Sequence, residues 1–246
     1  MTTTAGARSV AEMAAGLGTV LGIWAHPDDE AYLAGGVMAA AVAGGARVVC
    51  VTATRGERGT PDAVAWPPAQ LAAVREAELA ASLAILGVTE HRVLGYPDGG
   101  CAAVPSGEAV GRLAAAVAEV RPDTVLTFGP DGITGHPDHR TVSAWATAAV
   151  RRSGVATRLL HAAQTATWCA RFAELNRVLG VYPPGLPAVA PGGEIAFEVV
   201  LPDDLLDRKV AALAAQASQV GPLVERMGEA TFRSWVDTEC FRSAPV

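Results

Sequence analysis

The chain has 246 residues, of which 50% are hydrophobic and 18% are charged. This length is within the range of single α/β domains, and the composition excludes a disordered chain. The formal net charge of −6 provides no electrostatic footprint for nucleic acid or for an anionic membrane surface, so we expect neither as a partner.

Short apolar strands alternate with helices in the first part of the chain. Residues 19–25 read as a strand that is apolar on both faces, followed by an acidic turn and a helix over about 32–42. The stretch ARVVCVTAT (46–54) predicts a second strand, and the pattern indicates a long helix over about 68–86. Each strand runs straight into a polar turn.

The alternation continues with a short strand near 91–94, a helix over about 107–120 and a strand over 123–129. Strands that are apolar on both faces and are separated by helices are typical of a parallel sheet covered on both sides. We therefore predict an α/β fold with a Rossmann-like, mostly parallel sheet flanked by helices.

The last third of the chain begins at about residue 166. A loop rich in proline and glycine (182–193) precedes a predicted strand over 194–200 and a predicted helix from 203 to about 220.

No repeat or compositional boundary divides the chain. We therefore predict one domain over 1–246, with a core over about 17–165 and a C-terminal portion over 166–246 as a candidate small subdomain.

Unusual polar groups follow each of the first four predicted strands. Residues 26–30 (HPDDE) follow the first strand, 55–58 (RGER) the second, Asp98 the third, and 131–139 the fourth. In parallel sheets, ligands bind beyond the carboxyl ends of the strands. The candidate site is therefore expected at this edge of the sheet.

The triplet His-Pro-Asp occurs twice, at 26–28 and at 136–138, each time just after an apolar strand. A further histidine follows the second copy. Proline favours the first turn of a helix, so His136 and His139, at i and i+3, can face the same way.

His26, Asp29 and His139 form a donor set that suits a catalytic metal. A catalytic zinc typically has three protein ligands of this type and keeps one position open for water. Asp28 and His136 then remain beside the metal as an acid/base pair, as metal-assisted hydrolysis requires. Nitrogen and oxygen donors without thiolate suit Zn²⁺, and they also suit Fe²⁺ or Co²⁺.

Four motifs in a fixed order carry a resemblance: AHPDDE, TRGERG, PDG and GHPDH. With them the chain resembles the LmbE-like, or PIG-L, family of zinc-dependent N-deacetylases over roughly residues 1–140. Members of that family deacetylate N-acetylglucosaminyl-phosphatidylinositol, mycothiol and bacillithiol precursors, and glycopeptide antibiotics. The resemblance implies a hydrolase that removes an acetyl or other acyl group from the nitrogen of an amino sugar or glycoconjugate, in small-thiol or natural-product biosynthesis.

The family pattern also implies a role for each site residue. It implies His26, Asp29 and His139 as zinc ligands and Asp28 as the base that activates water. It implies His136 as the group that stabilises the oxyanion or protonates the leaving amine.

Two further positions, Arg55 and Asp98, match residues that contact the sugar in the family. Without that match, Arg55 would belong to an ordinary charged loop and Asp98 to a turn. Near the C-terminus the family often shows His-x-Ser-Gln on a helix, whereas residues 216–219 read QASQ. The replacement of this histidine by Gln216 indicates a changed role for that helix or a different substrate.

Two alternative functions stay open. One is an amidase that acts on a thiol conjugate or another natural-product amide, because the pocket and not the metal motif sets acyl preference. The other is a non-catalytic accessory protein that binds a metal or a sugar, against which the intact Asp28 and His136 argue. Binding of the dinucleotide NAD is disfavoured, since no G-x-G-x-x-G follows the first strand.

The remaining signals concern the environment of the protein. The four cysteines lie far apart without a C-x-x-C pair, which suits a reducing cytoplasm. No uncharged run reaches the length of a membrane helix, so we expect no membrane span. His91 and His161 lie outside the motifs and are interpreted as incidental. Whether the chain forms a homo-oligomer stays open.

Overall fold

The computed structural model describes residues 9–245. The strands are β1 (Val20–Trp24), β2 (Val48–Thr54), β3 (Glu90–Tyr96), β4 (Thr124–Phe128), β5 (Arg158–Ala162), β6 (Ile195–Val200) and β7 (Thr238–Ser243). They form one sheet in the order β3-β2-β1-β4-β5-β7-β6. The first five strands are parallel to one another, whereas β7 is antiparallel to both β5 and β6. The predicted, mostly parallel α/β sheet is therefore confirmed.

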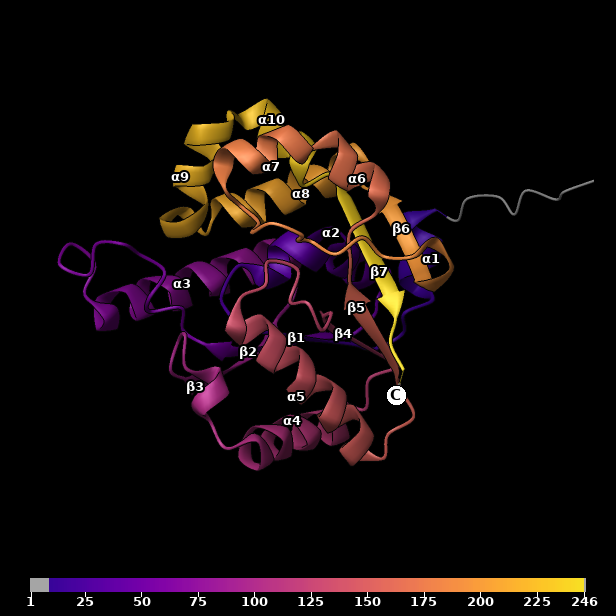
Figure 1. Cartoon of the computed structure of the whole chain (residues 1–246). Helices are drawn as coiled ribbons and strands as arrows, with labels where there is room; N and C mark the ends of the chain where they lie inside the picture. Colours follow the sequence, from indigo (N-terminus) through magenta and orange to yellow (C-terminus); the bar gives the residue numbers. More distant parts are fainter. Residues whose placement is uncertain (1–8, 246) are drawn as a thin grey trace, which may run out of the picture.

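Helices cover both faces of this sheet. They are α1 (Val10–Ala15), α2 (Asp29–Ala43), α3 (Pro68–Leu86), α4 (Ser106–Val120), α5 (Pro137–Ser153), α6 (Ala166–Arg171), α7 (Ala173–Leu179), α8 (Asp203–Ala214), α9 (Ala217–Met227) and α10 (Glu229–Trp235), with short 3-10 turns at η1 (Cys101–Ala103) and η2 (Gly192–Glu194). Figure 1 shows α4 and α5 on one side of the sheet and α2, α3 and α8 on the other. Every residue of β1, β2 and β4 is buried, which explains why these strands are apolar on both faces.

The helix after β1 begins earlier than its sequence predicts. We expected it from about residue 32, but α2 begins at Asp29. Asp29 and Glu30 lie in its first turn, where carboxylates interact favourably with the helix dipole and the free backbone N–H groups. The acidic motif is therefore part of the helix start and not a separate turn.

The C-terminal portion contains the main error in the predicted elements. One helix was expected from 203 to about 220, but α8 ends at Ala214 and α9 begins at Ala217. Between them Gln216 has φ −94° and ψ 48°, which is not helical. Its side chain turns into the core, and this turn interrupts the helix.

The C-terminal portion also completes the sheet of the N-terminal portion. β5, for which the sequence analysis predicted no strand, pairs with β4 on one side and with β7 on the other. One hydrophobic core extends from Met13 to Phe241. No helix within 9–245 is long and apolar enough to cross a membrane.

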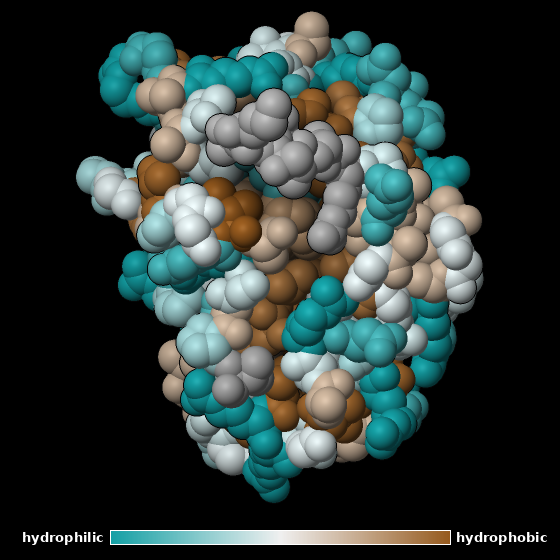
Figure 2. Space-filling view, turned by 90° about the vertical axis from the view of Figure 1, so that its right-hand side faces the viewer, coloured by the Kyte–Doolittle hydropathy of each residue, from teal (hydrophilic) through white to brown (hydrophobic). Residues whose placement is uncertain are grey.

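The sheet ends at an exposed edge. β6 is the last strand, and Val200 at its end is 67% exposed. Figure 2, which looks at the side of the molecule that Figure 1 places on the right, shows an apolar band between more polar flanks. This side is formed around β6 and β7 (Figure 1).

Candidate metal centre and active site

The site forms where two neighbouring parallel strands end. β1 and β4 pair in register, from Val20 opposite Thr124 to Gly22 opposite Leu126. Because parallel strands end at the same edge, the loops after Trp24 and Phe128 lie side by side. The strand order also reverses here, since β2 lies on the other side of β1. Residues more than a hundred positions apart in the sequence therefore meet.

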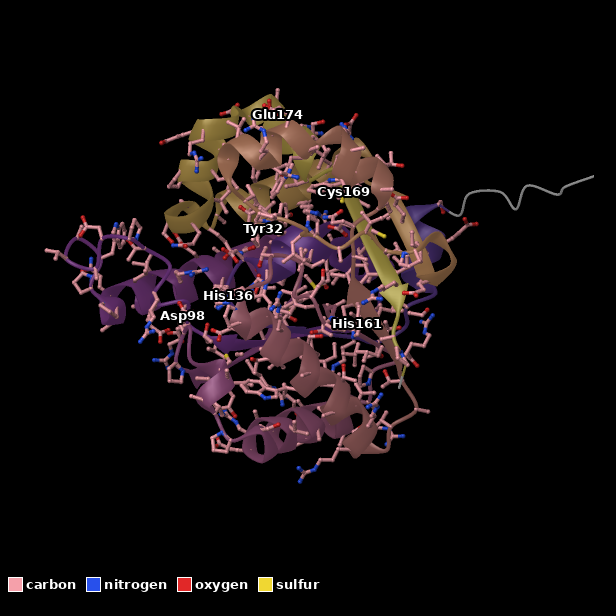
Figure 3. All side chains as sticks on the ribbon, in the orientation of Figure 1. Tyr32, Asp98, His136, His161, Cys169 and Glu174 are labelled. Atoms are coloured by element: carbon pink, nitrogen blue, oxygen red, sulfur yellow. The ribbon has the colours of Figure 1, made fainter. Side chains whose placement is uncertain are left out.

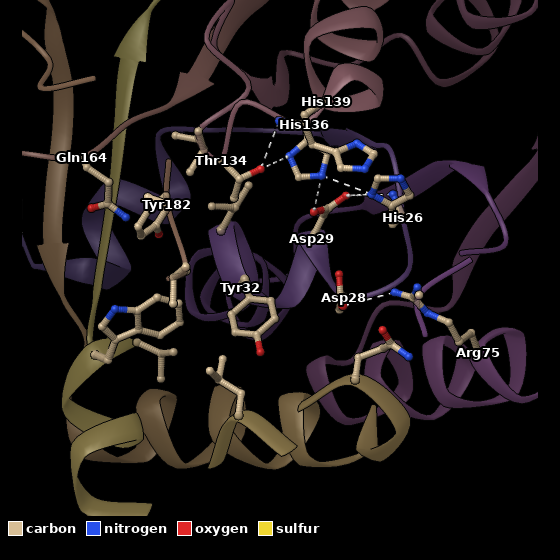
Figure 4. Close-up of a pocket in the computed structure, with 18 of the residues that line it drawn as sticks. His26, Asp28, Asp29, Tyr32, Arg75, Thr134, His136, His139, Gln164 and Tyr182 are labelled. Atoms are coloured by element: carbon tan, nitrogen blue, oxygen red, sulfur yellow. Dashed lines mark hydrogen bonds and ion pairs between the residues drawn. The ribbon is translucent and has the colours of Figure 1, made fainter. Parts of the chain in front are cut away.

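Two imidazole nitrogens and a carboxylate converge at this edge. His26 Nδ1 lies 3.1 Å from His139 Nε2. Asp29 places Oδ1 3.3 Å from His139 Nε2 and Oδ2 3.6 Å from His26 Nδ1 (Figure 4). A tetrahedral ion with bonds of about 2.0–2.1 Å separates its ligand atoms by roughly 3.3–3.4 Å. Each histidine nitrogen therefore has the other nitrogen and one oxygen of Asp29 near the spacing that such an ion requires.

Hydrogen bonds on the far sides of the rings set the direction of the lone pairs. His26 Nε2 lies 3.1 Å from Asp98 Oδ1 and 3.3 Å from Asp138 Oδ2, and His139 Nδ1 lies 3.0 Å from the carbonyl oxygen of Gly132. Each ring donates an N–H to these acceptors and turns its other nitrogen toward the converging group. Metal-binding histidines in proteins are held in this way.

Charge around His26 couples metal binding to protons. Burial would lower the pKa of His26, but hydrogen bonds to Asp138 and Asp98 and the charge of Asp29 raise this pKa to about 10. A divalent ion held by Nδ1 would replace a proton there, and its affinity should fall as the pH falls.

His136 lies beside this group. One of its ring nitrogens is within 4.8 Å of a ring nitrogen of His26 and of His139, so the three histidines are a further donor set that could hold an ion. The His136 ring meets the His26 ring edge-on at 4.8 Å between centroids. Its Nδ1 accepts a hydrogen bond from the backbone N–H of Asp138 at 3.2 Å, so Nε2 carries the proton. Burial and the charges of His26 and His139 lower the pKa of His136. At neutral pH it is therefore a neutral N–H donor.

Asp28 occupies an unusual backbone position next to the metal group. It has φ 104°, which is rare for a residue with a side chain, and it precedes the first turn of α2. Its Oδ2 accepts a hydrogen bond from Arg75 Nη2 at 3.2 Å. Burial, together with the charges of Asp29 and Asp98, raises the pKa of Asp28 to about 7, against the opposing charges of Arg75 and His26. The carboxylate is suited to exchange protons near neutral pH.

A cavity of about 510 Å³ opens beside these residues. Arg58, Arg75 and Gln219 form a polar part of its lining. The other part is apolar and aromatic, and it comes from α2 and from the C-terminal portion: Tyr32, Leu33, Trp168, Val181, Tyr182, Leu223, Trp235 and Val236. Figure 4 shows Tyr32 and Tyr182 on the far side of the cavity from the three histidines.

The structure brings most of the predicted site residues together. His26, Asp28, Asp29, His136 and His139 all line the cavity. In Figure 3, His136 lies centrally between the sheet and the upper helices.

The two predicted sugar contacts have different positions. Asp98 lines the cavity, but Oδ1 faces His26 and Oδ2 accepts from the backbone N–H of Arg58 at 2.8 Å. Arg55 is absent from the lining within residues 9–245; its exposed side chain pairs with Glu76 at 2.8 Å. The geometry therefore gives the predicted sugar contact of Arg55 no support.

Several important residues escaped the sequence analysis. Asp138 is fully buried and accepts hydrogen bonds from the backbone N–H groups of Gly99 and Cys101. The repeated His-Pro-Asp triplet was a signal for it. Arg75, in the middle of α3, had no such signal.

His91 and His161, which the sequence analysis set aside, do not line the cavity as described over 9–245. His161 is buried on β5, away from the other histidines (Figure 3), and burial lowers its pKa to about 4.

Sequence comparisons relate the chain to known proteins. The family model PIG-L, described as GlcNAc-PI de-N-acetylase, matches residues 21–150. A "1D-myo-inositol 2-acetamido-2-deoxy-alpha-D-glucopyranoside deacetylase" from Saccharomonospora viridis is 41% identical over 164 residues, which cover 58% of this chain and 61% of the relative. A protein of the same name from Acidothermus cellulolyticus is 34% identical over 241 residues, covering 82% of this chain and 80% of the relative.

Solved structures share the fold. N,N'-diacetylchitobiose deacetylase from Pyrococcus horikoshii matches with a TM-score of 0.65 at 24% identity, covering 93% of this chain and 84% of the other. A conserved protein from Thermus thermophilus matches with a TM-score of 0.62 at 32% identity, covering 92% and 95%.

Proposed function

Because the chain belongs to the PIG-L family, we propose that it is a metal-dependent hydrolase that removes an acetyl group from the nitrogen of an amino sugar or glycoconjugate. The observation that carries this proposal is the convergence of two imidazole nitrogens and a carboxylate at the cavity, with Asp28 and His136 beside them. The names of the relatives favour an acetamido sugar linked to inositol, in small-thiol biosynthesis.

We assign the metal to His26, Asp29 and His139, and we propose Zn²⁺ as the ion. The donor spacing and the hydrogen-bonded rings support this assignment. Fe²⁺ and Co²⁺ suit the same donors. When bound, the ion supplies a Lewis acid that polarises the amide carbonyl and acidifies water.

Asp28 is the proposed general base. Its carboxylate lines the cavity, and a pKa near 7 lets it accept a proton from the attacking water at neutral pH. It can then deliver that proton to the departing amine. Arg75 holds the same carboxylate in place.

His136 is the proposed donor to the carbonyl oxygen. Because Nδ1 accepts from Asp138, Nε2 presents its proton to the cavity in a fixed direction. A donor that is already aimed stabilises the negative charge that develops on this oxygen during attack. This assignment uses the neutral imidazole, which agrees with the lowered pKa of His136.

The polar part of the cavity is the proposed sugar site. Arg58 has an exposed side chain in the lining, and Gln219 and Asp98 lie on the same lining. Arg58 is therefore a better candidate for the sugar contact than Arg55. We expect the substrate to be a small molecule.

A second candidate function is hydrolysis of an amide that carries an apolar group. The aromatic part of the cavity, with Tyr32, Trp168 and Tyr182, favours this reading, because apolar and aromatic walls bind apolar ligand surface. An amide of a thiol conjugate or of another natural product is in this class.

The reducing cytoplasm is the proposed compartment. All four cysteines are free, and Cys50, Cys101 and Cys240 are buried. Free buried thiols suit a compartment in which disulfides are rare.

An assay of acetate release tests the proposed function. The purified protein, loaded with Zn²⁺, is incubated with N-acetylglucosaminyl-inositol, N-acetylglucosamine, an aryl N-acetylglucosaminide and a thiol-conjugate amide. We expect release of acetate from an N-acetyl sugar and its loss in Asp28→Asn. Metal binding without hydrolysis of any substrate would favour the accessory-protein alternative. Cleavage of the thiol-conjugate amide is followed by the free amine that it releases, and selective cleavage of this amide would favour the second candidate.

A further inference from the structure

The strained backbone of Asp28 needs a partner that holds it. A residue with a side chain at φ 104° is strained and keeps this conformation only when its surroundings fix it. Arg75 contacts the carboxylate and the carbonyl of Pro27. The backbone N–H of Asp28 donates to Glu30 Oε2 at 3.1 Å. The strained turn is therefore held from both sides, by Arg75 and by Glu30.

Glu30 is the one acid of the HPDDE motif that the proposed mechanism does not use. Its side chain is completely buried. The two oxygens accept from neutral donors, namely the backbone N–H of Asp28 and the side-chain amide of Gln216. A buried carboxylate that loses such a donor is destabilised, so its position depends on both partners.

Gln216 reaches Glu30 from the break between α8 and α9. It is 1% exposed, and its Nε2 donates to Glu30 Oε1 at 2.8 Å and to Ser82 Oγ at 3.1 Å. Both protons of the amide are thereby used. Gln216 does not belong to the cavity lining described over 9–245, so it lies behind the site and does not form its wall.

We propose that Gln216 is a positioning residue for the deacetylation proposed above: it fixes Glu30, and Glu30 holds the strained turn that directs the Asp28 carboxylate into the cavity. The inference rests on the proposed function for its catalytic consequence, and on the two hydrogen bonds for its geometry. It explains why a buried amide stands where a helix would otherwise continue.

We call the chain of contacts from Gln216 through Glu30 to Asp28 the relay. It predicts the effect of removing the side-chain amide of Gln216. Without Gln216 the buried Glu30 side chain lacks one hydrogen-bond donor and reorients. The N–H of Asp28 then loses its acceptor, and the strained turn relaxes toward negative φ. A displacement of about 1 Å at a reacting group lowers a rate by on the order of 10²-fold. The effect should appear in kcat and not in substrate binding.

Three variants of the Zn²⁺-loaded protein test the relay. Gln216→Met keeps the volume and removes both donors, and we expect kcat to fall on the order of 10- to 100-fold, with KM within about threefold and one bound metal. Gln216→His keeps an N–H at similar reach and should recover most of kcat. Ser82→Ala removes the other bond of the same amide and serves as the matched control, with kcat within about twofold of wild type.

A double-mutant cycle separates the relay from a general effect on packing. Gln216 acts through Glu30, so Gln216→Met combined with Glu30→Ala should be no slower than Glu30→Ala alone. Additive losses would overturn the relay. A folded, metal-loaded Gln216→Met with wild-type kcat would overturn it too. If Gln216→Met does not fold, Glu30→Ala decides: a folded, metal-loaded variant with wild-type kcat excludes the relay.

A crystal structure of Gln216→Met gives a readout that needs no activity. The relay predicts a negative φ at Asp28 in the variant, and a φ still near 104° would contradict it. If the wild type released no acetate from any substrate, the proposed function would fail while this structural result still decided the relay.

Discussion

The two His-Pro-Asp segments have the same sequence, but they differ in which side chain is buried and which faces the cavity. In 26–28 the histidine is buried and directs Nδ1 toward the proposed metal position, whereas Asp28 faces the cavity. In 136–138 the histidine faces the cavity as a donor, whereas Asp138 is completely buried. A motif therefore does not determine the role of each of its residues.

The start of the following helix explains the exchange. α2 begins after the first triplet, so Asp28 is its N-cap residue; α5 begins inside the second triplet, so His136 is its N-cap residue. The two triplets thus enter their helices two residues out of phase. Side chains at different positions in the first turn of a helix are directed differently. The histidine and the aspartate therefore exchange the buried and the cavity-facing positions between the two triplets.

Of all the variants, those that replace the histidine of each triplet should differ most from each other in metal content and activity. His26→Ala should lose the ion, and activity should fall on the order of 10³-fold, since metal catalysis is worth several kcal/mol. His136→Ala should keep the ion and lower kcat on the order of 10²-fold, as expected when one oxyanion donor is removed. Metal analysis and steady-state kinetics measure both. Equal metal loss in the two variants would remove the distinction.

The aspartate of the first copy should matter for rate and not for metal binding. Asp28→Asn removes the proposed base, so kcat should fall on the order of 10²-fold or more while the ion stays bound. Rate and metal content of the purified variant give the answer. If the rate is unchanged, another group accepts the proton.

The aspartate of the second copy should matter for the structure. Asp138→Asn replaces a fully buried acceptor of two backbone N–H groups, and its pKa is lowered by the bonds from His26, Gly99 and Cys101 despite its burial. We expect a loss of about 2–3 kcal/mol in the free energy of unfolding and a 10- to 100-fold loss of metal affinity. Urea unfolding and metal titration test this. A variant as stable as wild type would contradict the anchoring role.

The smallest expected effect concerns the stability of the metal-free protein. The folded-state pKa of Asp28 is raised to about 7 from an ordinary value of 3.8, so between these values the folded state binds more protons than the unfolded state. The contribution of Asp28 to the free energy of unfolding should therefore fall as the pH rises from about 4 to 7.

Asp28→Asn removes this titration, and asparagine also tolerates positive φ better. The variant should gain about 1 kcal/mol or more over wild type at pH 8 and little at pH 4.5. Urea unfolding at the two pH values measures the difference, and a gain of equal size at both would show that the charge of Asp28 is not its source.

The sequence predicted the central strands well because their apolar runs reflect burial on both faces. β1, β2 and β4 lie within a residue or two of the expected ranges, and α3 covers the expected 68–86. The hydrophobic pattern did not reveal that α2 begins as early as Asp29, nor that α9 is separate from α8. In both places buried polar side chains, Glu30 and Gln216, bond to each other, and that contact depends on packing between distant segments.

The sequence also determined which kinds of side chain form the site, namely imidazoles and carboxylates. The order of the motifs and their place after parallel strands predicted that His26, Asp28, Asp29, His136 and His139 would meet, and all five line one cavity. The position of each motif directly after a strand suffices for this prediction, because parallel strands bring the loops that follow them to one edge of the sheet.

Only the tertiary structure decided what each residue contacts. Arg55 turns to Glu76 in solvent, Asp98 and Asp138 hold His26, and Gln216 lies behind the site. The partners are far apart in the chain, so the pairing of β1 with β4 and the packing of α8 and α9 over α2 and α3 set these distances. Hydrogen bonds act over about 3 Å, and no local pattern of residues specifies which distant groups come that close.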